Sequence, residues 1–594
     1  MLKDNNIIKK IKLMPIAFIF FFIPIIVFMK HVNLTGDYFK YWNGLSDSYD
    51  FFAYYKSMTL VMLTGCVIFI FIYDLIAKRI KIKKMSVYIP IGIYTLMVVV
   101  SSVFSDYKEI ALLGFVERYE GMVVILCYIA ILFIAIQYLD NEDSIKFVLG
   151  ALMISATIIS IIGVFQYLGL DFFQTAIGKN LMLPKEYHEY AEAFGSKFGK
   201  NTIYSTLYHY NYVGSYMAMM FPFTLILAAY AKKNVNKILF GIITLLLFLN
   251  WFGSNSRAGI VGGVLAIIAI LIIMRKVLIE RWKITLVAVL IMMMLAVGLN
   301  IASDGMIFNR VKTIVGNITG KTTDAGGYKY KDIRYENNTL MLIDNKGELK
   351  ISSKGNEVIL KDENDKTLNP VLNENYMYVF NDERYSDYQI SKFKYDLNGK
   401  DTIVLNIVKL GTEFNVLLDG EDVKYLTPIF EVLDINQAER LGFYGKEKMG
   451  SARGYIWSRS LPLLKDAMIL GYGPDTFAAK FPQDDYLGKL VAYDTTQMLV
   501  DKPHNMYLQI ALSSGVISLI AFLAILVMYF VGCFKSLFGR DRNDILVVVG
   551  IGIFVGIIGY LGAGFFNDSV VAVAPVFWAL LGTGIGINYK LNLK

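Results

Sequence analysis

Residues 545–561 read ILVVVGIGIFVGIIGYL, an apolar run without a charged side chain. A helix needs about 20 such residues to cross the hydrocarbon core of a bilayer, where the backbone must satisfy its own hydrogen bonds. Similar runs recur along the chain, in which 55% of the residues are hydrophobic and the mean hydropathy is +0.49. The sequence therefore predicts an α-helical polytopic membrane protein.

The apolar runs number about twelve, each near the length that a bilayer core requires. They are Met14–Met29, Thr59–Ala77, Val87–Phe104, Gly121–Tyr138, Phe147–Leu168, Asn211–Ala231, Ile238–Phe252, Ala258–Met274, Ile284–Ile301, Leu508–Phe530, Ile545–Leu561 and Val570–Ile587. The first run follows a basic flank, but no small-residue cleavage site comes after it. We therefore expect it to be a retained anchor.

Clusters of Lys and Arg mark alternate connections between the predicted spans. Examples are Lys78–Lys84 and Lys232–Lys237, whereas the opposite connections are longer and carry fewer basic residues. Basic residues favour the cytoplasmic side, so both termini are predicted inside and the large loop after the ninth span outside. The acidic connection Leu139–Lys146 breaks the pattern. The net charge of +8 is attributed to topology, and we expect no nucleic-acid partner.

The polar residues concentrate between the ninth and tenth spans, which divides the chain into four parts. Residues 1–301 are predicted to form a membrane domain with spans one to nine, and residues 508–594 to add spans ten to twelve. Residues 302–450 are expected to form an external loop containing an inserted β domain at about 324–445. Residues 451–507 are expected to form an external helical loop with catalytic elements.

The inserted domain is predicted from turn signals between alternating strands. Leu340–Ile343 is followed by the turn Asp344–Gly347 and the alternating stretch Glu348–Ile351, and Asp419-Gly420 is a hairpin-type turn. Such hairpins are typical of antiparallel sheets. About 120 residues are enough for an independent core, so we expect a β-sandwich-like domain.

Two arginines on the predicted outer side are candidate phosphate ligands. Arg257 lies in a tight turn that leads into the eighth span, where a guanidinium and the N–H groups of a helix start suit a phosphate at headgroup depth. Arg453 lies near the start of a loop helix and would supply a second bidentate contact. Pairing with ordinary lipid phosphate or solvent explains either residue as well, and Arg459 competes with Arg453.

His504 is the candidate catalytic base, because it lies where the polar loop re-enters the membrane. A neutral imidazole there would take a proton from an attacking hydroxyl group. Capping of a helix N-terminus is the structural alternative. His188 and His209 share the predicted outer side and remain alternatives, whereas His31 is expected at the interface.

Further polar residues are expected to line an outer vestibule around these candidates. They are Arg118, Glu120, Asn211, Asn505 and Arg459. For Arg118 and Glu120 a structural ion pair is the competing interpretation.

Several functions are disfavoured because their motifs are missing from the sequence. No GxxxxGK[ST] loop for nucleotide phosphates and no HExxH or cysteine cluster for zinc is present. The acidic pair Asp484-Asp485 is a weak candidate for a metal site. We expect neither a metal nor a cofactor.

Three ordered blocks resemble the O-antigen ligase and polymerase superfamily, the WaaL-like and Wzy-like polytopic glycosyltransferases. The first is Ser254-Asn255-Ser256-Arg257-Ala258-Gly259 at the outer start of a span. The second is Arg453-Gly454-Tyr455-Ile456-Trp457 followed by Gly471-Tyr472-Gly473-Pro474-Asp475-Thr476-Phe477. The third is His504-Asn505-Met506-Tyr507-Leu508-Gln509 with Gly515. The resemblance covers nearly the whole chain except the β insert.

The resemblance implies a GT-C-like membrane fold in the bacterial cytoplasmic membrane and a metal-independent, inverting glycosyltransferase. Such an enzyme moves a glycan from an undecaprenyl-pyrophosphate carrier to a hydroxyl group on a glycan, lipid, wall polymer or protein during cell-surface polysaccharide assembly. Carried over to this chain, Arg257 and Arg453 would hold the pyrophosphate and His504 would act as the base. The large loop would be extracellular or periplasmic.

Three rival functions stay open at this point. A Wzy-type polymerase would join lipid-linked repeat units with the same chemistry. A transporter or flippase of lipid-linked sugars would need ionisable groups at the membrane midplane, and the predicted spans hold few. A sensor with an external β domain would need a cytoplasmic signalling domain, which the sequence does not show clearly.

Overall fold

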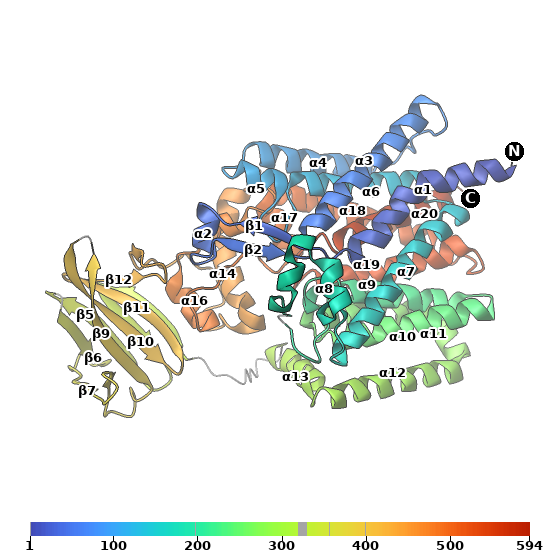
Figure 1. Cartoon of the computed structure of the whole chain (residues 1–594). Helices are drawn as coiled ribbons and strands as arrows, with labels where there is room; N and C mark the ends of the chain where they lie inside the picture. The colour runs from blue at the N-terminus through green and yellow to red at the C-terminus, as the bar shows by residue number, and fades with distance from the viewer. Residues whose placement is uncertain (1, 196–197, 319–328, 356, 398, 594) are drawn as a thin grey trace.

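A computed structural model describes residues 2–195, 198–318, 329–355, 357–397 and 399–593. The chain forms a bundle of long helices with a sheet-rich region beyond one end (Figure 1). Both termini lie at the opposite end of the bundle (Figure 1). The sheet-rich region and the chain termini therefore lie at opposite ends of the bundle.

The long apolar helices agree with the predicted membrane class. They are α1 (Leu2–Ile25), α3 (Tyr54–Ile76), α4 (Tyr88–Val103), α6 (Met122–Tyr138), α7 (Glu142–Tyr167), α9 (Tyr210–Tyr230), α10 (Asn234–Gly253), α11 (Arg257–Glu280), α12 (Trp282–Ala302), α18 (Val516–Ser536), α19 (Ile545–Ala563) and α20 (Ala574–Asn592). Within the described residues, 8 of them are long and apolar enough to cross a membrane, and α4 and α6 are shorter apolar helices. The total of twelve spans stays a prediction.

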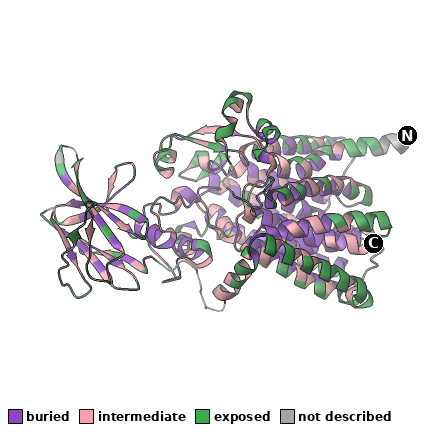
Figure 2. Cartoon of the chain, turned by 60° about the horizontal axis from the view of Figure 1, so that its bottom comes forward, coloured by how far each residue is buried: buried purple, intermediate pink, exposed green. Residues whose placement is uncertain are grey.

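Helices α9 and α19 form the centre of the bundle, and α12 lies outside it. The most apolar windows of α9 and α19 are each 83% buried, whereas that of α12 is 0% buried. Exposed residues cover the outward faces of the helices and buried residues fill the middle (Figure 2). A Cβ on Gly559 of α19 would meet the carbonyl oxygen of Ala218 at 2.0 Å. Small residues thus let the central helices approach closely, as is common in membrane bundles.

The predicted tenth span, Leu508–Phe530, is wrong as a single helix. The chain forms α17 (Met506–Ser514) and α18, separated at Gly515, whose φ is 90°. A Cβ on Gly515 would lie 1.9 Å from the carbonyl oxygen of Ile469. The N–H groups of Tyr472 and Gly473 donate to the last carbonyls of α17. The Gly471–Pro474 turn therefore docks against the break, which an apolar run cannot reveal.

The β insert consists of two antiparallel sheets that share one core. One sheet has the order β3-β4-β5-β6 and the other β13-β12-β11-β10-β9-β8-β7. The strands are β3 (Asp332–Glu336), β4 (Thr339–Ile343), β5 (Glu348–Lys354), β6 (Glu357–Lys361), β7 (Val371–Leu372), β8 (Tyr378–Val379), β9 (Tyr388–Leu397), β10 (Lys400–Lys409), β11 (Thr412–Asp419), β12 (Asp422–Leu426) and β13 (Val432–Leu433).

The pairing within the insert agrees with the turns expected from the sequence. β4 pairs with β5 across Asp344–Gly347, and Asp419 pairs with Asp422 around Gly420. Leu342 and Leu349 from one sheet share a buried cluster with Leu405 from the other. The packing of two sheets is thus sandwich-like, and the predicted start near Asp324 lies outside the described residues.

The remaining helices and strands connect the long helices and the insert. They are β1 (Lys30–Asn33), α2 (Asp37–Tyr41), β2 (Asp47–Asp50), α5 (Lys108–Leu113), η1 (Phe172–Gln174), α8 (Ala176–Met182), η2 (Lys185–Ala193), α13 (Met306–Ile318), α14 (Met449–Ala467), α15 (Phe477–Lys480) and α16 (Tyr486–Tyr493). Leu487, Leu490 and Val491 of α16 join the core of the insert. Helix α16 therefore ties the insert to the external helical loop.

Candidate functional site

His504 lies immediately before α17 and faces a buried carboxylate. Its Nδ1 is 3.0 Å from Oδ2 of Asp568, in the loop between α19 and α20, and the Asp568 side chain is 0% exposed. Burial lowers the pKa of His504 below its ordinary value of 6.5, although Asp568 opposes this effect. The imidazole is therefore neutral at pH 7. A neutral ring that carries its proton on Nδ1, the nitrogen beside Asp568, keeps on Nε2 the lone pair that a general base needs.

Asp568 stays ionised although it is buried. Burial by itself would raise the pKa of Asp568, but His504, Arg118 and Lys502 lower it to about 2. This carboxylate can therefore stabilise an imidazolium that forms when His504 accepts a proton. The sequence analysis missed Asp568. The only signal was the polar stretch Asn567-Asp568-Ser569 between two apolar runs on the predicted outer side.

The segment that carries His504 is held from several sides. Nε1 of Trp457 donates to the carbonyl oxygen of Pro503 at 2.9 Å. The N–H of Met506 donates to the carbonyl oxygen of Gly564 at 2.8 Å. Oδ1 of Asn505 accepts from the N–H groups of Tyr507 and Leu508, each at 3.0 Å. Asn505, expected in the vestibule, is thus the N-cap of α17 and fixes the direction in which the helix leaves His504.

Arg453 lies beside the His504–Asp568 pair at the start of α14. Its Nε and Nη2 donate to the carbonyl oxygen of Phe566 at 3.0 and 2.7 Å, and Nη1 donates to that of Gly450 at 2.6 Å. Burial lowers the pKa of Arg453, Asp568 raises it, and the charge of Arg257 lowers it. The two predicted phosphate ligands are therefore close enough to repel each other. An anion between them would relieve that repulsion.

Arg257 is the first residue of α11, as the sequence predicts. Oγ of Ser256 caps this helix by accepting from the N–H of Gly259 at 3.0 Å. The same hydroxyl donates to Oδ1 of Asn211 at 3.2 Å. Nδ2 of Asn567 donates to the carbonyl oxygen of Asn211 at 2.8 Å. Asn211 thus joins the Arg257 turn to the loop that carries Asp568.

Arg118 lies in the loop before α6 and interacts with several carboxylates, including that of Asp568. Its Nε donates to Oδ1 of Asp475 at 2.5 Å. Burial alone would lower the pKa of Arg118, but Asp475, Asp501, Asp568 and Glu120 raise it well above its ordinary value. Oδ2 of Asp475 also accepts from the backbone N–H of Glu120 at 3.2 Å. Arg118 is therefore a permanent cation whose loop is fixed by Asp475.

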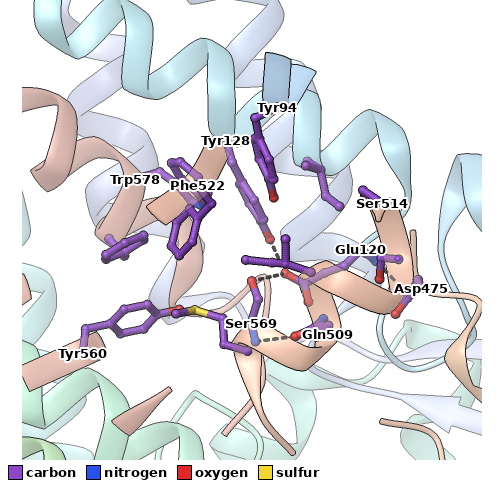
Figure 3. Close-up of a pocket in the computed structure, with 15 residues that line it drawn as sticks. Tyr94, Glu120, Tyr128, Asp475, Gln509, Ser514, Phe522, Tyr560, Ser569 and Trp578 are labelled. Atoms are coloured by element: carbon purple, nitrogen blue, oxygen red, sulfur yellow. Dashed lines mark hydrogen bonds between the residues drawn. The ribbon is translucent and has the colours of Figure 1, made fainter. Parts of the chain in front are cut away.

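Glu120 points into a small cavity of about 40 Å³ below the Asp568 loop (Figure 3). Its Oε1 accepts from the hydroxyl of Tyr128 at 2.6 Å and from that of Ser569 at 3.2 Å. The N–H of Ser569 donates to Oε1 of Gln509 at 2.8 Å. Burial raises the pKa of Glu120 to about 7. Glu120 is therefore buried and contacts the loop that carries Asp568 through Ser569, rather than lining an open vestibule.

Three other candidates have partners that assign them to different surroundings. Nε of Arg459 donates to Oδ2 of Asp485 at 2.9 Å, whereas Nδ2 of Asn436 donates to Oδ2 of Asp484 at 3.2 Å. The acidic pair proposed as a metal candidate therefore points in two directions. Nε2 of His188 is 3.1 Å from the carbonyl oxygen of Leu183. Arg459 and His188 are not brought together with His504.

His209 lies near His504 but has a capping role. Its Nδ1 accepts from the N–H of Asn211 at 3.2 Å, at the start of α9. Burial and the positive charges of Lys502 and Arg453 lower the pKa of His209 to about 3. His209 is therefore neutral and has its Nδ1 lone pair engaged.

Several buried polar atoms around His504 make no hydrogen bond among the described residues. They are Nη1 of Arg118, Oδ1 of Asn567 and both carboxylate oxygens of Asp568. Buried polar groups normally have a partner, so such a cluster of donors and acceptors suits polar groups of a substrate. Together with two arginines and a neutral imidazole, it can bind an anion and accept a proton.

The O-Antigen ligase family matches the chain at residues 423–523. The matched stretch includes Arg453 and His504 but neither Arg257 nor Asp568. No curated protein matches, and no solved structure matches. The match confirms the resemblance to the O-antigen ligase and polymerase superfamily. It indicates a membrane glycosyltransferase of the ligase or polymerase type.

Proposed function

We propose that the protein transfers a glycan from an undecaprenyl-pyrophosphate carrier to an acceptor hydroxyl group at the outer face of the bacterial cytoplasmic membrane. This would make it an O-antigen ligase-like enzyme of cell-surface polysaccharide assembly. The proposal depends chiefly on one observation: the imidazole of His504 rests on the buried carboxylate of Asp568 at 3.0 Å, next to Arg453. The family match supports the same chemistry.

The proposed reaction is a single displacement at the anomeric carbon of the donor glycan. The acceptor oxygen forms a bond to that carbon as the bond from the carbon to the pyrophosphate oxygen breaks. The hydroxyl proton moves to Nε2 of His504, and the electron pair of the broken bond leaves with the lipid pyrophosphate. Attack from the face opposite the leaving group inverts the anomeric configuration. Asp568 balances the positive charge that His504 gains.

Arg257 and Arg453 are proposed to bind the donor pyrophosphate. The leaving group gains negative charge in the transition state, so fixed guanidiniums stabilise that state more than the ground state. Arg453 is already fixed by the carbonyl oxygens of Phe566 and Gly450. Arg257 adds the N-terminal end of α11, where backbone N–H groups favour an anion. No metal is needed in this scheme.

The position of the site supports action on the outer face. Helix α14, which carries Arg453, and helix α17, which follows His504, lie on the side of the bundle toward the β insert, and both termini lie at the other end (Figure 1). The basic connection Lys232–Lys237 follows the C-terminal end of α9, whereas His209 caps the N-terminal end of the same helix. We therefore propose that both termini are cytoplasmic and that the insert is extracellular or periplasmic.

Reconstituted protein provides the test of this function. Proteoliposomes would receive an undecaprenyl-pyrophosphate-linked glycan, an acceptor-containing membrane fraction and a metal chelator. We expect transfer to continue with the chelator present and NMR of the product to show an inverted linkage. Retention of configuration, or movement of the intact donor across the membrane without transfer, would contradict the proposal. Growth of the lipid-linked glycan without an added acceptor would identify polymerisation instead of ligation.

A further inference from the structure

A groove lies between the β insert and the first external segment of the bundle. Its walls are α2 and the following turn, strands β12 and β13, and the stretch 483–499. Its volume is about 240 Å³. These three segments are far apart in the sequence, so the groove exists only because the insert docks on the bundle.

Contacts across the groove fix its shape. Nζ of Lys40 lies 3.3 Å from Oε1 of Glu431. Nδ2 of Asn43 donates to the carbonyl oxygen of Gln497 at 3.1 Å. A Cβ on Gly44, whose φ is 86°, would come within 2.6 Å of Ile429. The walls are therefore in direct contact at several points, and the groove is formed before any ligand binds.

The lining combines flat aromatic rings with neutral, acidic and lysine side chains. Tyr425 and Tyr486 stack with ring centroids 4.1 Å apart, and the hydroxyl of Tyr425 donates to Oγ1 of Thr496 at 2.8 Å. Tyr41, Gln483 and Asp484 also line the groove. Sugar rings present apolar C–H faces and many hydroxyl groups. Aromatic faces complement the first, while amide and carboxylate groups complement the second.

The groove leads toward the His504 segment. Gln483 lines the groove, and its side-chain amide makes two hydrogen bonds to the backbone of Val500. Nε2 of Gln483 donates to the carbonyl oxygen of Val500 at 2.8 Å, and Oε1 accepts from the N–H of Val500 at 3.3 Å. Leu499 is the last lining residue before that segment. An extended chain rises about 3.3–3.6 Å per residue, so Leu499 lies at most about 18 Å from His504. A polysaccharide strand in the groove can therefore reach the base.

We propose that this groove is a glycan subsite that binds the accepting polysaccharide strand and directs its end toward His504. The role of the bound strand as acceptor rests on the glycosyltransferase function proposed above. Binding of the strand to the groove does not depend on that function. Under this assignment the β insert supplies one wall of the acceptor site, through β12 and β13.

Photo-crosslinking in the polysaccharide-producing host tests the subsite without relying on turnover. The probe is Met498→p-benzoylphenylalanine, since Met498 lines the groove and is 40% exposed. The matched control is Tyr376→p-benzoylphenylalanine, which lies in the turn before β8, at the sheet edge opposite β13. We expect carbohydrate-positive adducts at least tenfold more abundant with the probe at Met498. Equal labelling at both positions, or adducts containing only protein or lipid, would overturn the subsite.

Repeating the experiment with His504→Gln separates the two proposals. Adducts that persist in a variant unable to transfer support the groove independently of the chemistry. If the wild-type protein transfers no glycan while Met498 still captures carbohydrate, the proposed function fails and the subsite stands. A second measurement uses Gln497→Ala, which removes an exposed lining side chain. We expect the KM for acceptor to rise at least threefold with kcat unchanged; an unchanged KM would count against the groove.

Discussion

The β insert and the insert-bearing end of the bundle each bury a carboxylate beside a basic side chain, but the carboxylate oxygens have different numbers of hydrogen-bond partners. In the insert, Asp344 pairs with Lys409, accepts from the hydroxyl of Tyr388 at 3.1 Å, and accepts from the N–H groups of Lys346 and Gly347 at 2.6 and 3.0 Å. Every oxygen of that carboxylate has a partner.

At the insert-bearing end of the bundle, Asp568 lies 3.0 Å from His504, and neither of its carboxylate oxygens makes a hydrogen bond among the described residues. Nη1 of Arg118, whose charge lowers the pKa of Asp568, also makes no hydrogen bond among the described residues. The contrast shows how a structural ion pair differs from a site. A structural pair uses all of its hydrogen-bonding capacity, whereas a site keeps some for substrate.

The largest effect is expected at the base. His504→Gln keeps a side chain of similar polarity but cannot accept the proton, so transfer should fall by about 10²–10⁴-fold. Rates in proteoliposomes, with thermal unfolding as the folding check, measure this. His188→Gln is the matched control, since His188 contacts the carbonyl oxygen of Leu183 and not the site. Equal losses in the two variants would contradict a special role for His504.

The next effect is expected at the carboxylate that orients the base. Asp568→Asn should reduce transfer by about 10²-fold, because the amide no longer favours the reactive tautomer or stabilises the imidazolium. Neutral His504 is the active form, so activity is lost as the pH falls through its pKa, which lies below 6.5. Asp568 raises that pKa.

Removing the Asp568 charge therefore lowers the pKa of His504 further, and the acidic limb of the pH–rate profile should move to lower pH. A carboxylate with only a structural role would reduce the rate at every pH and leave the limb in place. The pH profile of kcat/KM for wild type and Asp568→Asn separates these outcomes.

A smaller effect is expected at the phosphate ligands. Arg453→Lys keeps the charge but loses the two-pronged contact, and the lost charge-assisted hydrogen bond should cost about 10- to 100-fold in transfer. Arg440→Lys is the control, because Arg440 lies in the same external region with contacts of 3.9 and 3.7 Å to Asp332 and Glu447. Donor titrations of both variants test the difference. A loss in the control as large as that in Arg453→Lys would sink the pyrophosphate assignment.

The smallest effect on transfer is expected in the insert. Lys409→Met leaves the buried Asp344 charge without its cation, which should lower the free energy of unfolding of the insert by about 3–5 kcal/mol. Transfer should stay within about twofold, because the Lys409 pair and His504 share no partner. Hydrogen exchange of the β10 amides reports stability, and transfer is measured below the unfolding temperature. A large loss of transfer with unchanged hydrogen exchange would contradict a purely structural role for the Asp344–Lys409 pair.

The sequence predicts the helices and the β insert because their physical causes are local. An apolar run in hydrocarbon has to be helical, and Asp419-Gly420 favours a tight hairpin whatever surrounds it. The break at Gly515 has a distant cause, the docking of the Gly471–Pro474 turn on α17. Hydropathy therefore merges α17 and α18 into one predicted span.

The residues of the candidate site also differ in whether local sequence or contacts in space identify them. Arg257, Arg453 and His504 lie in recognisable blocks, so sequence alone selects them. Asp568 is selected only when α17 and the α19–α20 loop are brought together in space. Asn505 and Arg459 carry the right chemistry, but a helix cap and a buried ion pair already use them.

The most direct test of the central claim is a cryo-electron microscopy structure of the protein in nanodiscs with undecaprenyl pyrophosphate. The account predicts density for the diphosphate between the guanidinium groups of Arg257 and Arg453, within reach of His504 at the insert-bearing end of the bundle. A diphosphate bound at the end of the termini, or bound without contact to either arginine, would contradict it.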